Sequence, residues 1–120
     1  MSGVNVIPLC RFNEISGILK ASAHPVRLCI LGKLLAGGEC NVAALQHCTR
    51  KPQATVSQHL RKLKAMGIIT SERRGTEVFY SLTGRENQEF VGFLMDFNQK
   101  VFMKKRRIKG DEDSGRIVVG

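Results

Sequence analysis

A segment near the middle of the 120-residue chain carries side chains that could read the bases of a nucleic acid. Over residues 52–65, the apolar residues Val56, Leu60 and Leu63 are spaced four and three apart, which predicts a helix with one buried face. The opposite face would present short amide and hydroxyl side chains, which form hydrogen bonds with base edges in the major groove of DNA. These side chains belong to Gln53, Ser57 and Gln58.

Positive charge is concentrated around this helix. Residues 50–74 contain seven basic residues and one acidic residue, Glu72, in a chain whose formal net charge is +9. A basic surface of this kind attracts the phosphates of a nucleic acid, although a solvated helix face beside a charged turn is the alternative. The candidate phosphate contacts are Arg61, Lys62 and Lys64 on the helix, and Arg73 and Arg74 in a hairpin that follows it.

Helical spacing and helix-breaking residues predict the other elements. Pro25 and Pro52 suit the first turn of a helix, and Gly67 suits a helix end. We expect helices over 7–20, 25–36, 42–48, 52–65 and 85–103, and strands over 68–72 and 77–82 joined by a turn at 73–76. This order predicts a mainly α fold with a small β-hairpin, a winged helix-turn-helix (α-α-α-α-β-β-α).

The length of the chain indicates one domain. We expect residues 1–103 to form a DNA-binding and dimerisation domain, and residues 104–120 to form a charged, mobile tail. The sequence has neither a secretory signal nor an apolar run near the ~20 residues of a membrane span. We therefore expect a cytoplasmic protein without a membrane partner.

The sequence offers little to support an enzyme. It contains no glycine-rich phosphate loop and no paired carboxylate motif. His47 and Cys48 are adjacent, but neighbouring residues on a helix point about 100° apart and would not form a nucleophile–base pair. We predict no catalytic residues, no enzymatic activity and no cofactor.

Three stretches resemble the ArsR/SmtB-type family of dimeric winged-helix repressors. PQATVSQHLRKLKAMGII over 52–69 is similar to the recognition helix of the family, RGTEVFYSL over 74–82 to its wing, and HPVRLCIL over 24–31 to its second helix. The resemblance implies a repressor that binds a palindromic operator on double-stranded DNA as a homodimer. Lys51 and Ala54 depart from the family pattern. The resemblance places Gln53, Thr55, Ser57, Gln58 and Arg61 on the DNA-facing helix.

Two apolar stripes are the candidate dimer interface, unless they only cover the core of a monomer. One stripe lies on the first helix and the other on the last helix. They consist of Phe12, Ile15 and Leu19, and of Phe90, Phe93, Leu94, Phe97 and Val101.

The resemblance also implies release from DNA by a metal or a thiol-reactive signal. Asn41 and Ala43 occupy the positions of a family Cys-x-Cys metal site, and residues 85–103 contain no histidine, so we predict no metal site. Arsenic-responsive relatives suggest Cys10 and Cys40 as a thiol sensor, and we expect Cys29 to be buried. The sequence does not identify the inducer. A winged-helix protein-interaction module and a regulator that responds to a non-thiol small molecule stay open as alternatives.

Overall fold

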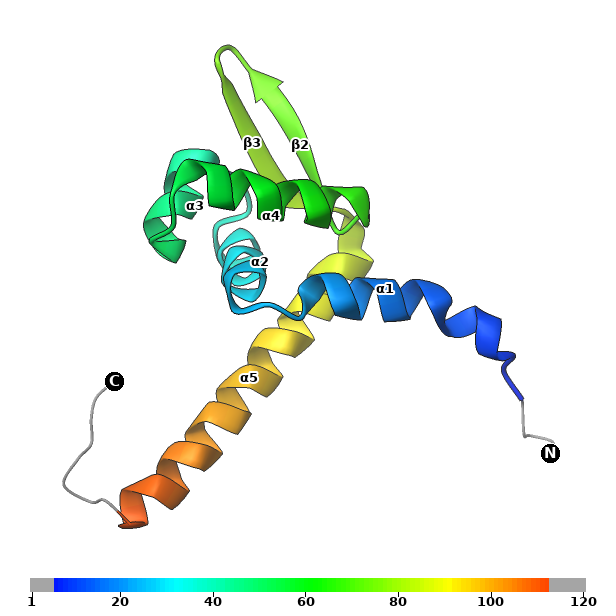
Figure 1. The fold of residues 1–120 in the computed structure, drawn as a ribbon, viewed down its shortest axis with the longest axis vertical. Coiled ribbons are helices and arrows are strands. Elements are labelled where there is room, and N and C mark those ends of the chain that lie inside the picture. The colour runs from blue at the N-terminus through cyan, green and yellow to red at the C-terminus, as the bar shows by residue number, and fades with distance from the viewer. Residues whose placement is uncertain (1–5, 113–120) are drawn as a thin grey trace.

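The computed structural model describes residues 6–112, with side chains described as far as Arg106, and its elements follow the expected order (Figure 1). Two short elements are additional, a 3-10 helix η1 and a strand β1. The elements are η1 Leu9–Phe12, α1 Asn13–Ser22, α2 Pro25–Gly37, β1 Cys40–Asn41, α3 Val42–Thr49, α4 Gln53–Ala65, β2 Ile69–Arg74, β3 Glu77–Leu82 and α5 Gly84–Glu112. The expected mainly α winged helix-turn-helix is confirmed.

Side-chain caps define where α2 and α3 begin. The Nδ1 atom of His24 accepts a hydrogen bond from the backbone N–H of Val26 at 3.1 Å, and Pro25 is the first residue of α2. The Oδ1 atom of Asn41 accepts from the N–H of Ala44 at 2.9 Å. Both caps satisfy N–H groups that have no partner within the helix.

The connection between α3 and α4 is tight. Arg50 adopts a left-handed conformation with φ 59°, and its N–H donates to the carbonyl of Gln46 at 2.7 Å. Pro52 follows in an extended conformation as the residue before α4, so α4 begins one residue later than expected. Residues 50–52 alone therefore turn the chain from one helix into the next.

The wing consists of β2 and β3, which pair antiparallel from Ile69 opposite Leu82 to Arg74 opposite Glu77. The turn at 75–76 has two residues, with φ 65° at Gly75, whereas we expected four. A two-residue turn with glycine suits the right-handed twist of paired strands, so β2 continues through Arg74. On its other side β3 pairs with β1, giving the sheet order β1-β3-β2.

The core lies where α2, α3 and α4 meet the sheet and the start of α5. Val56, Leu60 and Leu63 of α4 are at most 1% exposed, so the predicted buried face is confirmed. Their burial fixes which side of α4 faces outward. The other fully buried side chains are Ile30, Leu31, Leu34, Leu45, Ile68, Ile69 and Val91.

The last helix is longer than expected. We expected it to end near residue 103, but α5 continues to Glu112, so part of the predicted mobile tail is helical. Lysine and arginine have good helix propensities, and periodicity of apolar residues gives no signal in this segment. The rest of the expected tail, 113–120, lies outside the described residues.

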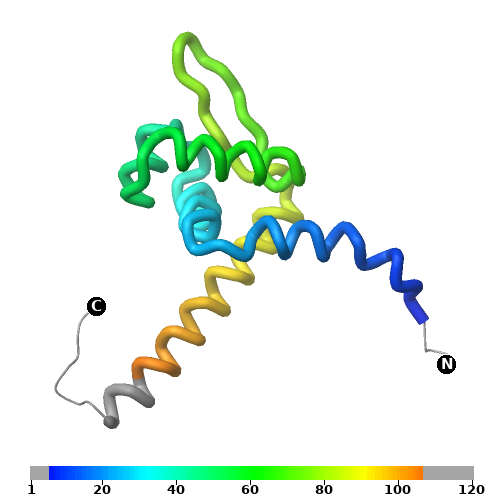
Figure 2. Tube along the Cα trace, in the orientation of Figure 1, coloured from blue at the N-terminus to red at the C-terminus, as the bar shows by residue number. Residues whose placement is uncertain are grey.

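Both α1 and α5 extend away from the body of the molecule, α5 on the side opposite the wing (Figure 2). Phe93 and Phe97 of α5 are 64% and 54% exposed, and their rings stack with centroids 6.0 Å apart. Phe12, the last residue of η1, and Ile15 and Leu19 of α1 are also exposed. These residues do not cover the monomer core, although Phe90 does pack against it. Among residues 6–112, no helix is both long enough and apolar enough to span a membrane.

Candidate nucleic-acid interface

The outer face of α4 carries the polar side chains that the sequence placed there. Gln53 and Gln58 are exposed, whereas Thr55 and Ser57 are half-buried at the edges of the face. Arg61 and Lys62 are exposed further along the helix. Since the apolar side of α4 is packed on the core, these side chains form one solvent-facing polar surface.

Lys64 connects α4 to the wing. Its Nζ atom donates a hydrogen bond to the Oγ atom of Ser71 in β2 at 2.7 Å. Lys64 is exposed, so its ammonium group lies at the open junction between the helix and the hairpin. A single phosphate group at this junction would contact both elements.

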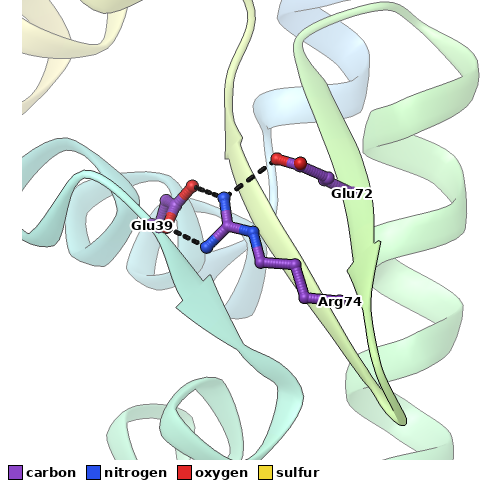
Figure 3. A network of polar contacts seen from close by, with 3 residues as sticks. All are labelled: Glu39, Glu72 and Arg74. Atoms are coloured by element: carbon purple, nitrogen blue, oxygen red, sulfur yellow. Dashed lines mark hydrogen bonds and ion pairs between the residues drawn. The ribbon is translucent and has the colours of Figure 1, made fainter.

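Arg74 is held by two carboxylates within the protein (Figure 3). Its Nη1 atom donates to Oε1 of Glu39 at 2.9 Å, its Nη2 atom donates to Oε2 of the same carboxylate, and Nη2 also donates to Oε1 of Glu72 at 2.9 Å. The guanidinium lies over the ring of Phe79, 4.8 Å from the centroid. Hydrogen bonding to Arg74 lowers the pKa of Glu39, and the two carboxylates raise the pKa of Arg74.

This network joins the wing to the loop that follows α2. A second contact acts in the same place, because Nδ2 of Asn41 donates to Oε1 of Glu77 at 2.8 Å. Arg73 lies on the opposite face of β2, since side chains alternate along a strand, and it is exposed. The two wing arginines therefore have different surroundings, which their adjacent positions in the sequence did not reveal.

His59 lies behind the polar surface of α4 and was not among the predicted site residues. It lies on α4 but faces α2, where Nε of Arg27 donates to its Nδ1 atom at 3.1 Å. The ring of His24 is 4.5 Å away, centroid to centroid. Burial, followed by the nearby groups His24 and Arg27, lowers the pKa of His59. Its position one turn from Val56 and Leu63 was the available signal.

The candidate thiol sensor is not assembled within one subunit. Cys10 is exposed on η1, which lies at the outer end of α1, far from α3 and the strand that precedes it (Figure 1). Cys40 is only 5% exposed, and burial raises the pKa of its thiol. Cys29 corrects our expectation, because it is exposed rather than buried: its side chain points from α2 toward α3 at the surface.

No metal centre is formed by the described part of the chain. Within it, no group of three or more histidine, cysteine, aspartate or glutamate side chains lies close enough to hold an ion. The three histidines do not gather, since His47 is exposed on α3 while His24 and His59 contact each other.

The biofilm growth-associated repressor of Xylella fastidiosa is 36% identical to the chain over 84 residues, which cover 70% of the chain and 73% of that protein. The profile of the ArsR family of bacterial regulatory proteins matches residues 24–71, from the residue before α2 into β2. The chain belongs to this family. The transcriptional repressor SmtB of Mycobacterium tuberculosis is 46% identical over 65 residues, 54% of the chain. The chain spans only 47% of that repressor's length.

Solved structures agree with the ArsR fold. A homodimeric winged helix-turn-helix DNA-binding domain from Mycobacterium bovis superposes with a TM-score of 0.71 at 25% identity, covering 85% of the chain and 94% of that domain. The ArsR family consists of DNA-binding transcriptional regulators, not enzymes. The resemblance inferred from the sequence is therefore confirmed at the level of family and fold.

Proposed function

We propose that this ArsR-family protein is a transcriptional repressor that binds a palindromic operator on double-stranded DNA as a homodimer. The observation that carries the proposal is the solvent-facing polar surface of α4 beside a wing that exposes Arg73. An α-helix fits the major groove, and a hairpin next to it can follow the adjacent backbone or minor groove.

The side chains of α4 would make two kinds of contact with DNA, to base edges and to phosphates. Gln53, Thr55, Ser57 and Gln58 would contact base edges, because amides and hydroxyls both donate and accept hydrogen bonds. Arg61, Lys62, Lys64 and Arg73 would contact phosphates. Arg74 would act differently from the phosphate contact that we expected: with two carboxylates on its guanidinium, it would hold the wing in place and contribute little net charge to DNA binding.

A homodimer would bring two copies of α4 to successive major grooves, about 34–36 Å apart along the DNA. The exposed apolar side chains of α1 and α5 support this arrangement, because a surface of this kind is usually covered by a partner. The Mycobacterium bovis domain with the same fold is described as homodimeric.

The signal that releases DNA is a separate part of the proposal. Release by a thiol-reactive or arsenic-type signal through Cys10 and Cys40 stays a prediction. It would need the two residues to meet across the dimer or after a movement of η1, since Cys40 is buried in its own subunit. Release by zinc, cobalt or nickel is not expected, because such sites need about four well-placed donors.

Selection from a random pool of DNA duplexes tests the proposal. The full chain should enrich duplexes with two-fold symmetry, and gel-shift titrations should then show a preference for them over scrambled duplexes. Gln53→Ala and Ser57→Ala should each reduce that preference. The binding free energy that separates the selected duplex from a scrambled one should fall by about 1–3 kcal/mol for each hydrogen bond to a base that is lost. Gln88→Ala, an exposed glutamine on α5, is the matched control. If no duplex is enriched, a protein-interaction module becomes the better interpretation.

A further inference from the structure

Two cysteines that are distant in the sequence lie together at the surface between α2 and α3. The Sγ atoms of Cys29 and Cys48 are 3.8 Å apart, and the Cys29 thiol is also 3.7 Å from the carbonyl oxygen of Cys48. We propose that Cys29 and Cys48 form a modification site, a dithiol that hydroperoxides oxidise to a disulfide joining α2 to α3.

The geometry requires only a small movement. A disulfide has an S–S length of about 2.0 Å, so the sulfur atoms must approach by about 1.8 Å. Both thiols already point toward each other from packed helices, and Cys48 Sγ is held by a contact to the carbonyl oxygen of Leu45 at 3.6 Å. Rotation of the two side chains between rotamers is the movement that would bring the sulfur atoms together.

Cys29 is the sulfur that an oxidant reaches first. It is exposed at the surface of the chain. Cys48 is half-buried behind Cys29.

The second thiol is placed to complete the reaction by its distance from Cys29, whereas its pKa slows the step at neutral pH. Burial, followed by its contact with Cys29, raises the pKa of Cys48 to about 11, while the ammonium of Lys33 acts in the opposite direction. Cys48 therefore remains protonated at neutral pH, and its sulfur becomes nucleophilic when the proton leaves during attack.

The reaction balances in two steps. The Cys29 thiolate attacks one oxygen of the hydroperoxide, the O–O bond breaks, and the other oxygen leaves as water or an alcohol, so that Cys29 becomes a sulfenic acid. The Cys48 sulfur then attacks the Cys29 sulfur and loses its proton, and the S–O bond breaks to release water. The two sulfurs together lose two electrons, which the hydroperoxide accepts.

The other two cysteines do not compete for this reaction within a subunit. Cys40 is buried, and Cys10 lies on η1 at the outer end of α1. The site also differs from the Cys10–Cys40 sensor, because it needs no partner subunit and no movement of η1. Any effect of the disulfide on DNA rests on the proposed function, since α3 leads directly into α4, but the thiol chemistry itself does not.

The test measures thiols without DNA. Fully reduced protein is treated with a small excess of hydrogen peroxide, the remaining thiols are alkylated, and intact mass and peptide mapping follow. We expect the loss of two of the four thiols, one cross-linked peptide pair containing Cys29 and Cys48, and full reversal by dithiothreitol. Cys10→Ser and Cys40→Ser should form the same disulfide.

Single variants separate the two roles. Cys48→Ser should accumulate a dimedone-reactive sulfenic acid at Cys29, and Cys29→Ser should lose most of the fast oxidation. In the wild type, disulfide formation should accelerate as the pH rises toward the raised pKa of Cys48. The proposal is overturned if the cross-link joins any other pair, or if Cys29 and Cys48 both survive oxidant that consumes free N-acetylcysteine in the same tube.

Discussion

His59 is a basic residue on α4 that serves the protein rather than a ligand. Its Nδ1 atom accepts the hydrogen bond from Arg27, so the ring is neutral and carries its proton on Nε2. Arg27 also donates to the carbonyl oxygen of Ala21 at 2.9 Å. The contact therefore joins the end of α1, the start of α2 and the inner edge of α4.

The free energy of unfolding should fall in mildly acidic solution because the His59 ring becomes protonated. A histidine whose folded-state pKa is lower than its ordinary value of 6.5 binds its proton more readily in the unfolded chain. Its stabilising effect is complete above that ordinary value and is lost as the pH falls through the lowered folded pKa. We expect the Tm of the wild type to fall between about pH 7.5 and 5.5.

His59→Gln should reduce that fall, because glutamine keeps an acceptor for Arg27 but does not titrate. Thermal unfolding followed by circular dichroism at both pH values measures the difference between the two proteins. His47→Gln, at an exposed position on α3, is the control and should leave the pH dependence unchanged. Identical pH profiles for wild type and His59→Gln would show that this ring does not control the effect.

The wing is an element whose position depends on ion pairs. Glu39 and Arg74 are each about half exposed, so solvent screens their pairing and it adds little to global stability. Its effect is on orientation, because a bidentate guanidinium–carboxylate pair fixes two groups in one plane. The pair connects the tip of β2 to the loop before β1, at opposite ends of the sheet order.

Glu39→Gln distinguishes wing positioning from simple charge. The substitution removes a negative charge, so electrostatics alone would strengthen DNA binding. If Arg74 positions the wing, the same substitution should weaken operator affinity about two- to fivefold, as Arg74→Ala should. Arg73→Ala should instead reduce the salt dependence of binding by about one phosphate contact per subunit. Tighter DNA binding by Glu39→Gln would contradict the positioning role and would indicate that Arg74 contacts a phosphate.

The sequence predicted most elements because each has local signals. Pro25 and Asn41 mark helix starts, and the stripe of α4 identifies its buried face. Strand β1 was missed because two residues carry no periodicity, and pairing with β3 alone defines it. The end of α5 was missed because charged helix formers continue a helix without an apolar stripe.

The candidate site was predicted only in part, for a different reason. The polar face of α4 follows from spacing, so its residues were available from the sequence. The contacts of Arg74 with Glu39 and of Cys29 with Cys48 join residues 35 and 19 positions apart. Such contacts depend on how the elements pack, and no local pattern encodes them.

The whole molecule exposes several large apolar side chains on α1 and α5, and a contiguous apolar surface of this kind marks an interaction site. Both helices extend from the body, so a second copy can pack against them without touching the wing (Figure 1). This arrangement leaves the DNA-facing surface free in the proposed dimer.

Phe97→Glu should therefore separate the subunits. Placing a charge in the centre of an apolar interface should weaken dimerisation by at least about 2 kcal/mol, roughly thirtyfold, and operator affinity should fall with it. Sedimentation velocity over a range of concentrations measures the equilibrium. Gln99→Glu adds the same charge elsewhere on α5 and should remain dimeric, as should the apolar variant Phe97→Leu. If Phe97→Glu remains a dimer, the subunits do not associate through this part of α5.

The sheet order leaves β2 as an outer strand, with one row of backbone N–H and C=O groups that no neighbouring strand covers among the described residues. Such a row is a template on which another extended chain can assemble, the first step toward fibrous aggregates. Glu72, Arg73 and Arg74 stand side by side at the end of this strand. Charged side chains at such positions disfavour pairing with a second strand, so the residues that hold the wing in place would also oppose aggregation of concentrated protein.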